Sequence, residues 1–213
     1  MRITAIEELS KSRSKIHIDG EFAFVLYKGE LRQYGFREGQ EISDRDYEII
    51  VTEILPRRAK LRAMNLLKSR EYTEQQLYRK LKDGLYPEEV IREALEYVAS
   101  YHYTDDLRYA VSYIEAHESS RSRRRIEQDL LGKGIPGAIL EQAWNEWEAR
   151  GGRMDEAAMV HSLLRKRGVD PEQADANTLR KTYAFLQRKG FSFETIRKAM
   201  KGFGETDCGG DCE

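Results

Sequence analysis

The sequence predicts a mainly α-helical protein, made of tandem three-helix repeats that form an elongated curved body, with a small N-terminal α+β unit that contains a hairpin. Alternation of polar and apolar residues is confined to roughly the first 56 residues. The rest is rich in Leu, Ala, Glu, Lys and Arg, which favour helices. Within that rest, one apolar spacing recurs three times, as in helical repeat proteins.

The N-terminal segment has the pattern of a small sheet. Residues 15–18 alternate polar and apolar, Asp19 and Gly20 form a tight-turn pair, and residues 22–27 supply a returning strand. Residues 3–9 are predicted to add a strand, and residues 28–39 a short helix. Residues 44–55 have helical spacing, which Pro56 is expected to end. We assign residues 1–56 to this sheet-containing unit.

The helical region repeats one pattern of apolar residues. After Leu81, Leu130 and Leu186, apolar residues recur ten, thirteen and fourteen positions on, and a third helix precedes each pair. A glycine between the paired helices can close the first of them with a positive φ. The three sets are Leu81, Ile91, Ala94 and Leu95; Leu130, Leu140, Ala143 and Trp144; and Leu186, Ile196, Ala199 and Met200, with glycines Gly84, Gly134 and Gly190. We predict repeats at 57–103, 104–152 and 153–203, then a disordered acidic tail at 204–213.

Composition argues against membrane, secreted and enzymatic classes. Lys and Arg total 36 against 37 Asp and Glu, and no apolar run approaches the length of a membrane span. The acidic start does not fit a secretory signal, so we expect the reducing cytoplasm. The four histidines lack metal-ligand spacing, and no phosphate-binding loop or nucleophile elbow occurs, so we predict no catalysis and no cofactor. Cys208 and Cys212 can form a tail disulfide or a weak metal site, but not a four-ligand zinc site.

Three stretches resemble one known family. They are YTDDLRYA at 103–110; RIEQDL at 125–130, running on to Lys133-Gly134-Ile135; and the first repeat from Ser69-Arg70 through EQQL at 74–77 to Leu81. This ordered set, spread over roughly residues 57 to 201, resembles the RecX family. The N-terminal unit and the cysteine-containing tail depart from the shortest members.

The resemblance implies a non-enzymatic bacterial regulator of the RecA recombinase. Such a protein binds RecA and its filament on single-stranded DNA, lodges in the filament groove, and restrains filament extension, ATP hydrolysis, strand exchange and coprotease activity. We expect a monomer with weak direct DNA affinity and no membrane partner. The alternatives are a helical DNA-binding protein that acts without RecA and a general protein-binding adaptor.

Basic residues are the candidates for partner contact, because they attract phosphates and acidic protein surfaces. Repeats one and three are basic, and the middle repeat carries a run at 121–125. At 100° per residue, Arg121, Arg124 and Arg125 share a helix face, Arg123 points elsewhere, and Lys133 can extend the patch. The competing interpretation is a solvated face paired with Glu118, Glu127 and Asp129. Further candidates for binding RecA or DNA are Arg57, Arg58, Arg62, Arg165, Lys166, Arg167, Arg188 and Lys189.

Two of these interpretations have ordinary structural alternatives. Cations in the last turn of a helix stabilise it by roughly 0.3–1 kcal/mol, which explains Arg165 to Arg167 as well as binding does. Aromatic side chains can stack on bases, but Trp144 falls on a repeat core position. Trp147 is expected to pack against the next repeat or to be partly exposed, and Tyr101, Tyr103, Tyr109 and Tyr113 to pack near a junction.

Overall fold

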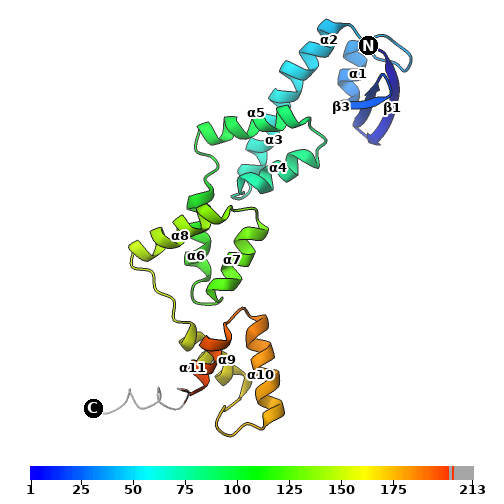
Figure 1. Ribbon diagram of the computed structural model, residues 1–213. Coiled ribbons are helices and arrows are strands. Elements are labelled where there is room, and N and C mark those ends of the chain that lie inside the picture. The colour runs from blue at the N-terminus through cyan, green and yellow to red at the C-terminus, as the bar shows by residue number, and fades with distance from the viewer. Residues whose placement is uncertain (202, 204–213) are drawn as a thin grey trace. The chain divides into compact units, whose positions relative to one another are not determined.

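The computed structural model describes residues 1–201 and 203 and divides into two compact units, the first spanning Met1–Asp105 and the second starting at Asp106. The predicted fold class is confirmed: the chain is mainly helical, with three tandem three-helix domains and an N-terminal antiparallel sheet (Figure 1). The predicted tail, 204–213, with Cys208 and Cys212, lies outside the described residues.

The sheet has three antiparallel strands in the order β1-β2-β3, and the predicted hairpin is its second half. Asp19 and Gly20 both have positive φ, 52° and 92°, as a two-residue hairpin turn that matches the strand twist requires. Ile16 and Phe24 face each other across the hairpin and are buried. The strands are β1 Ile3–Ser10, β2 Arg13–Ile18 and β3 Glu21–Tyr27.

The prediction that Pro56 ends a helix is wrong. The helical backbone runs on through this residue, because a π-helical turn precedes it and the Leu55 N–H bonds the Ile50 carbonyl five residues back. Proline in a regular helix collides with the carbonyl four residues earlier, and the widened turn relieves that conflict. The helices of this part are α1 Lys28–Tyr34, shorter than predicted, α2 Asp44–Ile49, the π turn η1 Ile50–Ile54, and α3 Leu55–Leu67.

One core holds the first unit together. Buried residues from the sheet, such as Ile16, join those of the first three-helix domain, such as Leu55 and Leu81, in a single hydrophobic cluster. Two helices complete this domain, α4 Glu74–Lys82 and α5 Glu88–Ser100. The sheet and the first repeat are therefore stabilised by the same burial of apolar surface.

The second unit contains the other two domains, each around its own cluster. Leu130 and Trp144 lie in one cluster, and Leu186 and Ile196 in the next. The helices are α6 Asp106–His117, α7 Arg123–Gly132 and α8 Gly137–Ala149, followed by α9 Glu156–Arg167, α10 Ala176–Arg188 and α11 Phe193–Lys201. No helix in the described part of the chain is both long enough and apolar enough to span a membrane.

The repeat pattern identified the core residues. All twelve anchor residues of the three sets are buried, and Trp144 occupies the core position expected for it. The glycine prediction holds for Gly134 and Gly190, whose φ angles are 90° and 93°. It is wrong for Gly84, since the following residue, Leu85, takes the left-handed conformation at φ 62°.

The packing predicted for two tyrosines is wrong. Tyr101 and Tyr103 are 57% and 47% exposed. Tyr101 is the C-cap of α5, so it leaves the buried face of that helix, and its ring lies against those of Tyr97 and Tyr103, 5.0 and 5.9 Å away between centroids. Helical spacing does not apply beyond a helix end.

Candidate functional site

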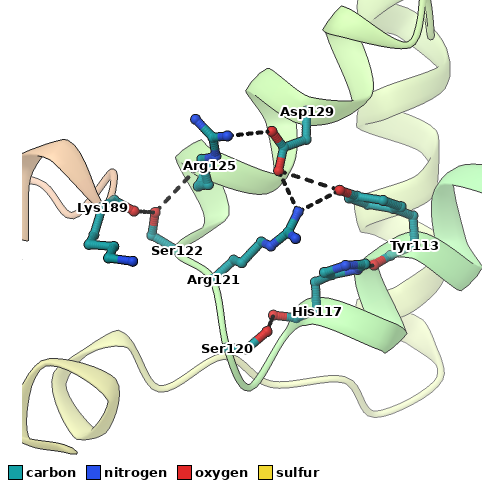
Figure 2. Close-up of polar contacts among 8 residues, drawn as sticks. All are labelled: Tyr113, His117, Ser120, Arg121, Ser122, Arg125, Asp129 and Lys189. Carbon is teal, nitrogen blue, oxygen red and sulfur yellow. Dashed lines mark hydrogen bonds and ion pairs between the residues drawn. The ribbon is translucent and has the colours of Figure 1, made fainter. Parts of the chain in front are cut away.

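The start of α7 is fixed by one serine. The Ser122 Oγ accepts a hydrogen bond from the Arg125 N–H at 3.3 Å, which makes Ser122 the N-cap. The same hydroxyl donates to the backbone carbonyl of Lys189 at 3.0 Å, at the end of α10 (Figure 2). This buried serine therefore joins the second domain to the third. It also leaves Arg121 outside the helix.

Asp129 holds two arginines of the basic run. Its Oδ2 accepts from Arg121 Nη1 at 2.6 Å, and its Oδ1 lies 3.1 Å from Arg125 Nη2. Arg121 Nη1 also donates to the Tyr113 hydroxyl at 2.6 Å, and the ring of His117 stacks on Tyr113 (Figure 2). Such charge-assisted bonds fix the direction of both guanidinium groups.

These arginines line a pocket of about 590 Å³ together with basic residues of the third domain. Arg188 ends α10 and Lys189 is its C-cap, and both line the pocket together with Arg121 and Arg125. Apolar side chains complete the lining: Leu163, Phe185 and Phe191. We call this the α7–α10 pocket.

Cations also cover the aromatic wall of the α7–α10 pocket. The Arg167 guanidinium lies 4.3 Å from the centroid of the Phe185 ring, and Lys189 Nζ lies 5.8 Å from it. Cations are attracted to the faces of aromatic rings. Five cations therefore lie at this pocket, and the Asp129 carboxylate pairs with only two of them, Arg121 and Arg125. The pocket is therefore suited to an anionic partner.

The structure brings together five of the twelve predicted residues at this pocket: Arg121, Arg125, Arg167, Arg188 and Lys189. Arg124 does not join them. It is exposed and lines a second pocket of about 960 Å³, next to Arg123 and Trp144. The face predicted for it assumed that Arg121 was already helical, which the Ser122 cap prevents.

The remaining residues of the second unit have local explanations. Lys133 Nζ lies 5.2 Å from the ring centroid of Tyr113, whose hydroxyl contacts Arg121. Arg165 and Lys166 are exposed in the last turn of α9, where cations favour the helix dipole.

In the first unit, Arg58 is used by the fold. It donates to the Val25 carbonyl at 2.9 Å, pairs with Glu30, and covers the Tyr27 ring at 4.6 Å. Arg57 and Arg62 are exposed. Arg58 therefore fixes the sheet to α3, whereas Arg57 and Arg62 make no such contact within the described residues.

Part of the basic run at 121–125 is paired with carboxylates of the same domain, as the competing interpretation of a paired face expects. Arg123 pairs with Glu127 at 3.1 Å, and its guanidinium lies over the buried Trp144 ring at 4.4 Å. Glu118 instead accepts from Nε1 of the buried Trp147 at 2.6 Å. Ion pairing thus engages Arg121, Arg123 and Arg125.

The sequence interpretation missed the apolar wall of the pocket. Phe185 and Phe191 flank the anchor Leu186 and the glycine Gly190, so their position beside a domain junction could have indicated them. Within residues 1–201 and 203, no cluster of three or more His, Cys, Asp or Glu side chains is arranged to hold a metal ion.

Comparison with known proteins assigns the family. Three family descriptions match the chain: "RecX, first three-helix domain" at residues 59–97, the second such domain at 105–143, and the third at 155–200. A "Regulatory protein RecX" from Caldanaerobacter subterraneus subsp. tengcongensis is 32% identical over 202 residues, covering 94% of this chain and 98% of the relative. The chain belongs to the RecX family.

Other RecX proteins are similar to this chain in sequence and fold. The "Regulatory protein RecX" of Clostridium acetobutylicum is 27% identical over 203 residues, 93% of this chain and 94% of that one. A crystal structure of a regulatory protein RecX superposes with a TM-score of 0.60 at 25% identity, covering 94% and 98% of the two chains. RecX from Lactobacillus salivarius shares the fold, with a TM-score of 0.56 at 19% identity over 70% of this chain and 97% of that one. These RecX relatives are regulatory proteins, not enzymes, as the sequence predicted.

Proposed function

We propose that this RecX protein regulates RecA by binding the RecA protein and its filament on single-stranded DNA, in the filament groove, and that it restrains filament extension, ATP hydrolysis and strand exchange. Family membership supports RecA as the partner. The observation that carries the choice of surface is the α7–α10 pocket, where cations of two domains meet an aromatic wall. Acidic side chains of a protein partner and DNA phosphates are both attracted to such a surface.

The most informative residues of the pocket are Arg188 and Lys189. Arg188 is exposed and has no ion-pair or hydrogen-bond partner in residues 1–201 and 203, so its charge is available to a partner. The only interaction of the Lys189 ammonium in the same residues is with the Phe185 ring. Changing these two side chains removes charge without breaking a described ion pair.

The test compares two double variants in assays of RecA ATPase and filament length on single-stranded DNA. Arg188→Ala with Lys189→Ala is expected to weaken inhibition about tenfold or more, since charge-assisted contacts are among the stronger polar interactions. Lys181→Ala with Lys201→Ala is the control, because this double substitution removes the same amount of charge. Lys181 is exposed on α10 and Lys201 on α11. Equal inhibition by both variants would reject the pocket, and no effect of the wild-type protein at saturation would reject RecA regulation.

The same cations also suit a DNA-binding protein that acts without RecA. That function predicts binding to single-stranded DNA alone, with log K falling against log salt by about 0.7 per phosphate neutralised. A steep slope without RecA, combined with unchanged RecA ATPase, would favour this alternative.

A further inference from the structure

A second basic pocket lies in the first unit, between the sheet and the first repeat. It has a volume of about 380 Å³, and three cations from three different elements line it: Arg13 at the start of β2, Arg62 in α3 and Lys80 in α4. Tyr27 and Tyr86 form its aromatic lining. Arg13 and Tyr27 belong to the sheet, so the pocket is completed by the N-terminal segment.

The three cations have no counter-charge of their own. In the described ranges 1–201 and 203, Arg13, Arg62 and Lys80 make no ion pair and no side-chain hydrogen bond. Arg58 is the contrast, because it lies one turn before Arg62 on α3 and is held by a carbonyl, a carboxylate and a ring. Converging like charges repel one another unless an anion lies between them. The single carboxylate that lines the pocket, Asp83, does not neutralise three cations.

Tyr86 adds a hydrogen-bond donor. It is half-buried, and this burial raises the pKa of its phenol above the ordinary value of 10.0, while the nearby Arg58, Arg62 and Arg13 act in the opposite direction. The hydroxyl therefore keeps its proton at neutral pH and can donate to an oxygen of a ligand. Gly84 leaves room for the ring, since a Cβ there would lie 3.0 Å from Tyr86 Cε2.

The geometry points to a phosphate-binding site in this pocket, in which Arg13, Arg62 and Lys80 neutralise the anion and the Tyr86 hydroxyl donates to one of its oxygens. Guanidinium groups match phosphate oxygens with paired N–H donors, and an ammonium adds a point charge. The phosphate belongs either to a nucleic-acid backbone or to a free polyphosphate. The inference does not depend on the proposed function, because it uses no residue of the α7–α10 pocket.

The experiment uses the full chain and two triple variants of equal charge. The pocket variant is Arg13→Gln, Arg62→Gln and Lys80→Gln. The control variant is Lys11→Gln, Arg45→Gln and Lys68→Gln, three exposed cations of the same unit that do not line the pocket. Each is titrated with a fluorescent single-stranded oligonucleotide, followed by anisotropy, and with inorganic tripolyphosphate, followed by calorimetry. Circular dichroism and melting temperature verify folding.

Loss of affinity of about tenfold in the pocket variant, with the control variant close to wild type, would support the site. If the loss affects the oligonucleotide, the ligand is a nucleic-acid backbone; if it affects only tripolyphosphate, the ligand is a free polyphosphate. Equal losses in both variants, or no loss in either, would overturn the inference. As a measurement on the unaltered protein, the ring signals of Tyr86, assigned by comparison with Tyr86→Phe, should shift in the NMR spectrum as either probe binds. Unshifted signals at saturation also overturn it.

Discussion

The side-chain hydroxyl of Ser122 donates to the backbone carbonyl of Lys189 across 3.0 Å, although 67 positions separate the two residues. Because the same oxygen caps α7, a single atom links the start of one helix to the end of another. We expect Ser122→Ala to lower the free energy of unfolding by about 1–2 kcal/mol, through loss of the cap and of the bond between the domains. Urea denaturation measures this change.

The control for this variant is Ser192→Ala. The Ser192 hydroxyl accepts from the Thr195 N–H at 3.0 Å, and its only other described hydrogen bond is with the Thr195 hydroxyl. Its loss should cost about 1 kcal/mol or less, the range of a helix cap alone. A cost as large as that of Ser122→Ala would show that the bond to Lys189 contributes nothing.

Gly190→Ala should destabilise the second unit more than Gly151→Ala. Both glycines have positive φ, 93° and 89°, so both substitutions carry the strain of a left-handed conformation, roughly 1–2 kcal/mol. A Cβ at Gly190 would in addition overlap Ser122 Oγ and lie 3.2 Å from Arg125 Cβ, whereas one at Gly151 meets nothing within 4 Å. The difference in melting temperature between the two variants measures the crowding alone. Equal melting temperatures would contradict it.

Asp129→Asn should have opposite effects on stability and on binding. The substitution removes the carboxylate that holds Arg121 and Arg125, which we expect to cost about 1–2 kcal/mol of stability. It also raises the net positive charge of the α7–α10 pocket, so affinity for single-stranded DNA or RecA filaments should increase at low salt. Glu127→Gln is the control, because it removes one of the two carboxylates that pair with Arg123, a residue that does not line that pocket. Weaker binding by Asp129→Asn would mean that the two arginines must be held in place to act.

Tyr86 should make stability depend on alkaline pH. Its pKa is raised in the folded protein by burial, so the unfolded chain loses this proton first as pH rises. The stabilising contribution is therefore complete below about pH 10 and disappears as pH rises through the folded pKa. The measurement is urea unfolding from pH 8 to 11 for wild type and Tyr86→Phe, whose difference isolates this residue from the other tyrosines. A difference that does not change with pH would contradict the prediction.

The apolar periodicity predicted the helical repeats because burial of side chains such as Leu81, Leu130 and Leu186 is what stabilises each domain. The hairpin could also be predicted from the sequence, since Asp19-Gly20 can adopt the positive φ angles that its turn requires. The helices and the hairpin depend on the spacing and type of residues that are close together in the sequence, so a short stretch of sequence is enough to predict them.

The site was only partly predictable. Helical spacing predicts one face for Arg121, Arg124 and Arg125, but the helix begins only after its N-cap Ser122, so Arg121 lies before it. Arg58 and Arg62 are equally basic in sequence, yet only the folded structure distinguishes Arg58, which pairs with Glu30 of α1. Which cations remain available to a partner depends on contacts between distant segments, and composition does not record those contacts.

The π turn before Pro56 also bears on how this protein can be dissected. Backbone from Asp44 to Leu67 is helical throughout, so a protease that requires an extended strand finds no favoured cleavage point near residue 56. A chain trimmed to begin at residue 57 would start inside a helix and would lack Leu55 and Pro56, two buried residues of that helix. The cut would also divide the single hydrophobic cluster that joins the sheet to the first three-helix domain.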